Sequence, residues 1–319
     1  MPQKNVLFVR FSSLGDIITN NYYAMKIKEK HPDWHLTWLV DSLYAPLVRI
    51  QPWVDSVIEW DRKNTGNAGF LKILRKVRAE KYDLLIDAHG SDRMAFFSFL
   101  SGASEKIGLK HDWIPFKIHD SNDFSSLLDD KDKMYLCPKY LFSGESKDEA
   151  YTADEKHKKI LILAIGASFK KKRWPVQSWI AFCRLSAEAG WRMILVGSGV
   201  EEVQAAREII KAVGSEQIVN LVGGLSILEL VQTIDTGAIM IAGDTGPLHI
   251  ARALGIKTIG LFGPTLVEKN YMDHLSQVFY SDCADIECEN WDCQKPCLET
   301  ISPQTVFACA EELLATTQP

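Results

Sequence analysis

Short apolar segments alternate with amphipathic segments along most of this chain, and this alternation restricts the possible fold most strongly. In the first hundred residues it predicts strands at 6–11, 36–40, 56–60 and 83–87 and helices at 16–30, 70–79 and 94–100. Later it predicts strands at 159–164, 192–196, 218–221, 238–242 and 258–262 and helices at 176–189, 200–213, 226–235, 247–254 and 303–315. Such alternation indicates βαβ units and parallel sheets with helices on both faces.

Residues 111–158 interrupt this rhythm with an acidic stretch and a polar run. A chain of 319 residues is long enough for two domains, each with its own core. We therefore predict two doubly wound α/β domains, 1–154 and 155–319. The second would include a Cys-rich segment and the terminal helix 303–315, which could pack back on the first domain.

Composition limits the class of protein. The chain is 46% hydrophobic and 24% charged, as in globular proteins, and its net charge of -5 argues against a nucleic-acid partner. The N-terminus has no secretory signal pattern and no apolar run approaches the ~20 residues that cross a bilayer. We expect a cytoplasmic protein, with any membrane contact peripheral, at the inner face of the cytoplasmic membrane.

The segment 239–249 carries the clearest indication of a site. An apolar strand runs there into a turn of small residues, and Pro247 suits the first turn of a following helix. Unpaired N–H groups at a helix N-terminus attract phosphate, so Asp244 and His249 could hold the hydroxyls or charge of a phosphorylated ligand. The alternative is that Asp244 caps the helix and His249 is a surface residue.

Two further strand ends carry candidate groups. Asp16 follows the first strand, where a ligand-facing carboxylate could act as a general base, although Asp16 or Ser13 could instead cap the helix. Residues 170–173 form a run of four cations that either binds an anion, with Ser168 as a donor, or is a solvated loop.

The turn at 197–199 is rich in glycine but does not complete a dinucleotide-binding fingerprint, because Glu202 stands where the third glycine belongs. A nicotinamide cofactor is therefore not indicated. Glu201 could instead bind the hydroxyls of a nucleotide ribose.

Four cysteines near the C-terminus have the spacing C-x4-C-x4-C-x3-C: Cys283, Cys288, Cys293 and Cys297. In a reducing compartment such a cluster suggests a metal, but the spacing differs from paired C-x2-C knuckles. Metal binding, reduced thiols and an adventitious disulfide all stay open, and a bound metal would be structural.

The chain resembles glycosyltransferase family 9, which includes the ADP-heptose:lipopolysaccharide heptosyltransferases. The resemblance rests on FVRFSSLGDII at 8–18, DLLIDAHGSDR at 83–93, GASFKKKRWP at 166–175, LVGSGVEE at 195–202 and GDTGPLHIARALGIKTIGLFGPT at 243–265. It implies a GT-B architecture, in which two Rossmann-like domains face each other across a cleft. It also implies metal-independent, inverting transfer of heptose from ADP-heptose to a lipopolysaccharide core or related glycan, with no cofactor.

The resemblance also implies roles for particular residues. Asp16 would be the base, with Ser13 and Gly15 on the acceptor side. The donor-binding positions would be Ser168, Lys172, Glu201, Leu225, Asp244, Thr245, Gly246, Pro247 and His249. Ala167 stands where many heptosyltransferases have a second hydroxyl, and together with the Cys-rich segment this leaves the identity of the donor sugar open.

Two other interpretations remain at this stage, since a fold does not fix a reaction. One is a nucleotide-sugar epimerase on the same scaffold. The other is a non-catalytic module that binds a nucleotide or sugar.

Overall fold

The computed structural model describes residues 3–108, 159–214, 216–265, 275–281, 290 and 297–315. The chain divides into two compact units, Met1–Leu136 and Cys137–Pro319. This division and the predicted boundary after residue 154 both fall within 109–158, outside the described residues, so the exact boundary stays a prediction.

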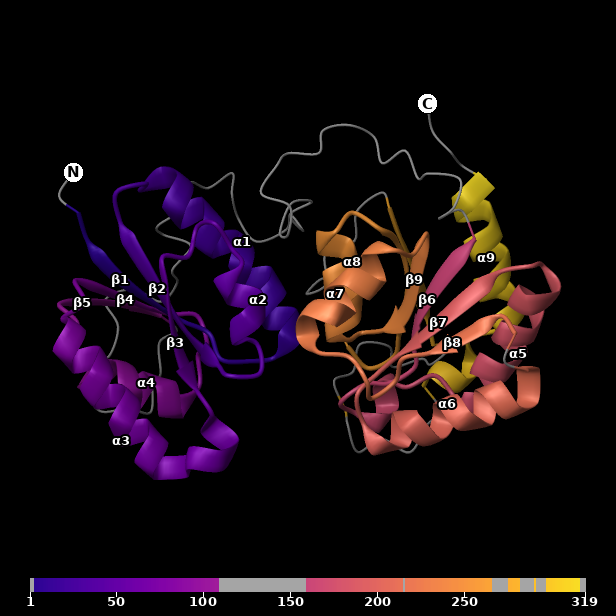
Figure 1. Ribbon diagram of the computed structural model, residues 1–319, viewed down its shortest axis with the longest axis horizontal. Helices are drawn as coiled ribbons and strands as arrows, with labels where there is room; N and C mark the ends of the chain where they lie inside the picture. Colours follow the sequence, from indigo (N-terminus) through magenta and orange to yellow (C-terminus); the bar gives the residue numbers. More distant parts are fainter. Residues whose placement is uncertain are drawn as a thin grey trace. The chain divides into compact units, whose positions relative to one another are not determined.

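The first unit is a five-stranded parallel sheet in the order β3-β2-β1-β4-β5. Its elements are β1 (Asn5–Val9), α1 (Leu14–Lys30), β2 (His35–Asp41), α2 (Ala45–Arg49), β3 (Ser56–Trp60), α3 (Arg62–Glu80), β4 (Leu84–Asp87), α4 (Asp92–Leu100) and β5 (Glu105–Gly108). Figure 1 shows α1 and α2 on one face of the sheet and α3 and α4 on the other. The predicted doubly wound topology is confirmed for this unit.

The second unit is a six-stranded parallel sheet in the order β11-β10-β9-β6-β7-β8. Its elements are β6 (Ile160–Ala164), the 3-10 turn η4 (Lys170–Lys172), α5 (Val176–Glu188), β7 (Arg192–Val196), α6 (Val200–Val213), β8 (Ile218–Asn220), α7 (Ile227–Asp235), β9 (Ile239–Gly243), α8 (Gly246–Ala253), β10 (Lys257–Phe262), β11 (Ser276–Tyr280), the 3-10 turn η6 (Leu298–Thr300) and α9 (Pro303–Ala315). If β6 to β11 are counted as strands 1 to 6, their order in the sheet is 6-5-4-1-2-3, which is the Rossmann arrangement.

Both sheets contain a switch point. The second and third strands of each unit are added on one side of its first strand, and the later strands are added on the opposite side. In the first unit the switch point lies between β1 and β4, and in the second between β6 and β9. In open α/β sheets the connections diverge at such a point, and ligands bind at the carboxyl ends of the strands there.

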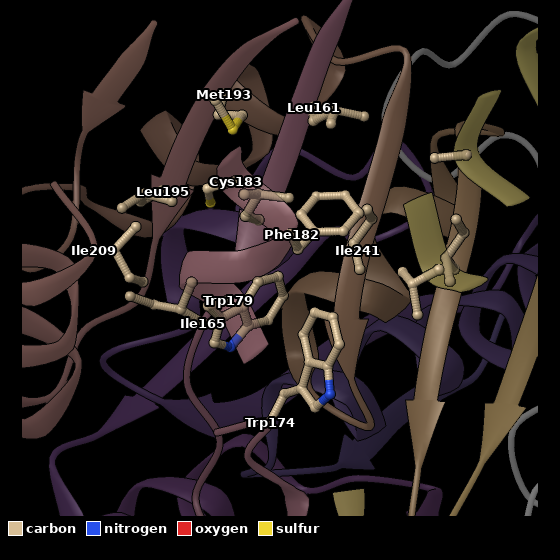
Figure 2. Packing of buried hydrophobic residues seen from close by; sticks show 14 of the residues in the cluster. Leu161, Ile165, Trp174, Trp179, Phe182, Cys183, Met193, Leu195, Ile209 and Ile241 are labelled. Carbon is tan, nitrogen blue, oxygen red and sulfur yellow. The ribbon is translucent and has the colours of Figure 1, made fainter. Parts of the chain in front are cut away.

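The core of the second unit forms where α5 packs on the sheet. Figure 2 shows Trp179 and Phe182 among aliphatic side chains of the neighbouring strands. The rings of Trp174 and Trp179 meet edge to face, with centroids 4.9 Å apart, and the Trp174 indole donates a hydrogen bond to the Ile301 carbonyl at 3.2 Å. These contacts fix the polypeptide just after the cationic run.

The terminal helix α9 belongs to the core of the second unit. It packs against α5 and β10 of its own unit, and Val306 and Ala310 are fully buried in that unit's core. Its apolar face is therefore used within the second unit, and packing of this helix on the first unit stays a prediction.

Elements absent from the sequence-based assignment are short or lie at sheet edges. Helix α2 has five residues, too few to show helical periodicity, while β5 and β11 are edge strands without a continuous apolar run. The predicted first strand extended to Phe11, but strand pairing ends at Val9. Phe11 is nevertheless fully buried, packed edge to face against Trp60.

Candidate functional site

The switch point of the first unit carries an ion pair. Arg10, just after β1, places Nη2 2.5 Å from Oδ2 of Asp16 in the first turn of α1. The other terminal nitrogen of Arg10, Nη1, donates to the Ala88 carbonyl after β4 at 2.5 Å. Arg10 thus connects the ends of the two strands that flank the switch point.

Ser13 holds the same carboxylate. Its backbone N–H and its hydroxyl donate to Asp16 Oδ2 at 2.8 and 2.9 Å. Asp16 therefore does satisfy a free N–H at the helix start, as the capping interpretation proposed. Because 45% of its side chain is exposed, capping does not prevent a chemical role.

The pKa of Asp16 is lowered from its usual value. Burial raises it, but the positive charge of Arg10 and the hydrogen bonds from Ser13 and Arg10 more than offset that effect. The carboxylate is consequently ionised at neutral pH and has free lone pairs. Gly15, also predicted on this side, is buried in the first turn of α1.

His89 lies at the same switch point and was missed as a site residue by sequence reasoning. Burial, together with the nearby charges of Arg10 and Arg62, lowers its pKa to about 4, so the imidazole is neutral at physiological pH. Its Nδ1 is buried and has no hydrogen-bond partner within the described parts of the chain. The position of His89 directly after the strand 83–87 was the available signal.

The second switch point also carries an ion pair. Lys172 Nζ, in the turn after β6, lies 2.5 Å from Asp244 Oδ2 after β9. Their side chains are only 17% and 11% exposed. His249 Nε2, in the first turns of α8, lies 3.7 Å from Asp244 Oδ1, which is too long for a good hydrogen bond. The structure therefore brings together three of the predicted donor-binding residues.

The pKa of Asp244 is far below its usual range. Burial opposes this shift, and the interactions with His249 and Lys172 outweigh it. Neither alternative interpretation made from the sequence holds here. The N-cap of α8 is Thr245, not Asp244, and His249 is 15% exposed rather than a surface residue.

Backbone packing fixes the cationic turn against the sheet. A β-carbon on Gly243 would collide with the Lys172 carbonyl, and one on Gly263 would lie 3.3 Å from the Lys171 carbonyl. Pro247 occupies the first turn of α8, as predicted, next to Gly246 at the helix start. Glycine at 243 thus permits the close approach on which the Lys172–Asp244 pair depends.

The glycine turn at 197–199 accommodates a carboxylate. β-Carbons on Gly166, Gly197 or Gly199 would each crowd the buried side chain of Glu202. The residue that breaks the dinucleotide fingerprint therefore fills the space beneath the turn.

The remaining predicted donor-binding residues are accessible to different degrees. Glu201 is 75% exposed and forms an ion pair with Arg173, whose Nη2 is 3.8 Å from Glu202 Oε1. Ser168 is exposed, and Leu225 is half-buried in the loop before α7. These positions surround the carboxyl ends of β6 to β8.

The cysteine prediction falls mostly outside the described residues, which exclude Cys283, Cys288 and Cys293. Cys297 is buried against Gly263, and no cluster of three metal-ligating side chains occurs within the described ranges. Metal binding by the cysteines stays a prediction.

Within the described ranges, no helix has the length and apolar content needed to span a membrane.

Two doubly wound units with charged side chains at their switch points define an α/β protein of the GT-B glycosyltransferase type. The chain belongs to glycosyltransferase family 9 (heptosyltransferase), whose sequence profile matches residues 114–280. It is therefore a glycosyltransferase, and the epimerase and binding-module interpretations are set aside.

Individual proteins agree with this assignment. Lipopolysaccharide heptosyltransferase 1 of Campylobacter coli is 24% identical, covering 97% of this chain and 98% of the relative. The crystal structure of a family 9 glycosyl transferase from Veillonella parvula has a TM-score of 0.78 at 16% identity, covering 99% of both chains. E. coli heptosyltransferase WaaC with ADP-2-deoxy-2-fluoro heptose has a TM-score of 0.72 at 19% identity, covering 97% of this chain and 99% of the other.

The Lys172–Asp244 pair predicts a stability pattern. Lys172→Met should lower the free energy of unfolding by about 2 kcal/mol, because the mostly buried Asp244 charge loses its partner. Lys172→Met/Asp244→Asn should recover part of this loss, because the amide carries no charge. Urea unfolding would measure both, with the exposed Lys170→Met as the matched control. An equal loss in the double variant would contradict the explanation.

Proposed function

We propose that this glycosyltransferase moves heptose from ADP-heptose to a lipopolysaccharide core or related glycan, with inversion at the anomeric carbon. The observation that carries the proposal is the ionised, accessible Asp16 carboxylate at the switch point of the first unit. The donor identity is supported by WaaC, a protein of the same fold that has been crystallised with an ADP-heptose analogue. The lipopolysaccharide acceptor is supported by the Campylobacter relative.

Asp16 is proposed as the general base. An acceptor hydroxyl donates its proton to the carboxylate while its oxygen attacks the anomeric carbon, and the bond to the diphosphate oxygen breaks with its electron pair. Arg10 and Ser13 hold the carboxylate through Oδ2, so Oδ1 is the oxygen available to the acceptor. Direct displacement of this kind inverts the configuration.

Lys172 and the start of α8 are proposed to stabilise the leaving ADP. An ammonium group has three donors, so Lys172 can keep its bond to Asp244 and still donate to a phosphate oxygen. Ser168 and the backbone N–H groups of Gly246 and its neighbours would add further hydrogen bonds. These groups neutralise the developing charge without a metal ion.

The other donor contacts follow from the same placement. Glu201 would bind the ribose hydroxyls, its ion pair with Arg173 keeping the carboxylate close to the turn at 197–199. Leu225 would pack against the base, and Thr245, Pro247 and His249 would surround the diphosphate and sugar. Peripheral contact with the inner face of the cytoplasmic membrane is part of the proposal, because the acceptor is a lipid-linked glycan.

Asp16→Asn tests the base. The amide can still accept the Ser13 hydrogen bonds but cannot take a proton, so turnover should fall about 100-fold or more. Binding of ADP, measured by calorimetry, should be unchanged. Glu29→Gln, an exposed carboxylate on the same helix, is the matched control. Normal turnover in Asp16→Asn would refute the assignment.

Arg10→Gln tests the electrostatics of the base. Arg10 lowers the pKa of Asp16, so the deprotonated base persists to lower pH in the native enzyme than it would without that charge. Removing the charge raises this pKa, and the acid limb of the kcat/KM profile should move to higher pH. Lys26→Gln, a cation further along α1, should leave the limb in place. If the acid limb of the kcat/KM profile does not move in Arg10→Gln, a group other than Asp16 is responsible for that limb.

Thermal unfolding with nucleotides tests the donor. At about 100 times its dissociation constant, a ligand stabilises a protein by about 2.7 kcal/mol. At equal concentrations ADP should raise the Tm more than GDP or UDP, and Lys172→Ala should reduce the shift while Lys170→Ala keeps it. A larger shift with GDP or UDP would exclude an ADP-linked donor.

A further inference from the structure

Helices α3 and α4 form a continuous outer surface on one face of the first sheet, which we call the α3–α4 surface (Figure 1). The helices run side by side and are joined along their length. Arg93 Nη2 approaches the Gly66 carbonyl at 3.5 Å, the Phe70 and Phe96 rings stack, and Arg78 Nη1 donates to the Leu100 carbonyl at 3.0 Å.

The inner and outer faces of α3 differ sharply. Ile73, Leu74 and Val77 are buried against the sheet. The outer face carries the exposed residues Leu71, Lys72, Arg75, Lys76 and Arg78. Over its whole length α3 has six Lys or Arg and one acidic residue, Glu80, in a chain whose net charge is -5.

These cations differ from several others in the unit. Lys4, Lys26, Lys28 and Arg49 each form an ion pair with a carboxylate. Within the described ranges, Lys72, Arg75 and Lys76 form none. The acidic residues of the two helices and their caps are Asp61, Glu80 and Asp92, all near the helix ends. A strongly positive field therefore remains over the middle of α3.

Large apolar side chains are exposed on both helices. Leu71 is 53% exposed, Phe96 47% and Phe99 43%. Phe96 and Phe99 lie on one side of α4, and the Phe70 stack brings Phe96 beside α3. Exposed aromatic and aliphatic groups within a basic surface suit the interface of an anionic bilayer, where apolar groups enter the acyl boundary and cations meet the headgroups.

We propose that the α3–α4 surface binds the protein to membranes that carry anionic phospholipid. Lys72, Arg75 and Lys76 contact phosphate headgroups, and Leu71 and Phe96 insert beside them. Nucleic acid fits less well, because Leu71 has no aromatic face on which a base could stack and the net charge of the chain is -5. The inference rests on the peripheral membrane contact in the proposed function and names the surface that makes it. Bilayer binding needs neither donor nor acceptor, so vesicle binding can fail while the transfer reaction proceeds, and the two failures are distinguishable.

Flotation with lipid vesicles tests the proposal. The full chain should bind phosphatidylcholine vesicles that contain about 30 mol% phosphatidylglycerol, bind pure phosphatidylcholine weakly, and dissociate as salt rises. Each basic residue near an anionic surface strengthens binding by about fivefold, so Lys72→Glu/Lys76→Glu should weaken it by at least about 25-fold. Leu71→Ser should weaken binding by about fivefold with the salt dependence retained.

A matched charge reversal is available in the second unit. Arg207 and Lys211 are exposed on α6 with the same spacing of four residues, and Arg207→Glu/Lys211→Glu should bind vesicles like the unmodified chain. Circular dichroism melting checks that all variants fold. Equal losses in both charge-reversal variants would show only a net-charge effect and overturn the proposal. So would absence of binding to the anionic vesicles, or binding of a control RNA in their place.

Discussion

The Lys172–Asp244 ion pair is the interaction on which the second unit's site depends. It joins the loops that follow β6 and β9, the two strands flanking the switch point, although the residues lie 72 positions apart. Its side chains are mostly buried, so neither charge is tolerable without the other. The close approach of the Lys172 carbonyl to Gly243 and the anchoring of Trp174 position the pair. A ligand phosphate at α8 would thus meet a cation already held in place.

The first unit uses the same arrangement with a different outcome. Arg10 again bridges the two strands at the switch point, but its partner Asp16 remains 45% exposed. A buried carboxylate orients its lysine, whereas an exposed carboxylate can accept a proton from a substrate. The differing burial of two otherwise similar pairs therefore accounts for their proposed roles, donor binding for one and base catalysis for the other.

Much of the fold was predictable from periodicity, because buried parallel strands are continuous apolar runs and the helices between them are amphipathic. Helix α6 and strand β7 were predicted with the bounds that the structure shows. Edge strand β11 and the one-turn α2 were not, since partial exposure and short length remove the pattern. Asp16, Lys172 and Asp244 were singled out because they lie in the segments that follow strands. His89 also follows a strand, but its buried, unpaired Nδ1 depends on packing that the sequence does not display.

The sequence by itself determined the alternation of strands and helices, the positions of the polar strand ends and the resemblance to family 9, because these depend on local composition and spacing. Only the tertiary structure decided which charges meet. Arg10 with Asp16, Lys172 with Asp244 and Arg173 with Glu201 pair because strand order brings particular carboxyl ends together. It also decided that exposed Phe96 lies beside Phe70 of α3, since that requires α4 to pack alongside α3. Strand order and helix packing follow from burial across the whole chain, which no local pattern encodes.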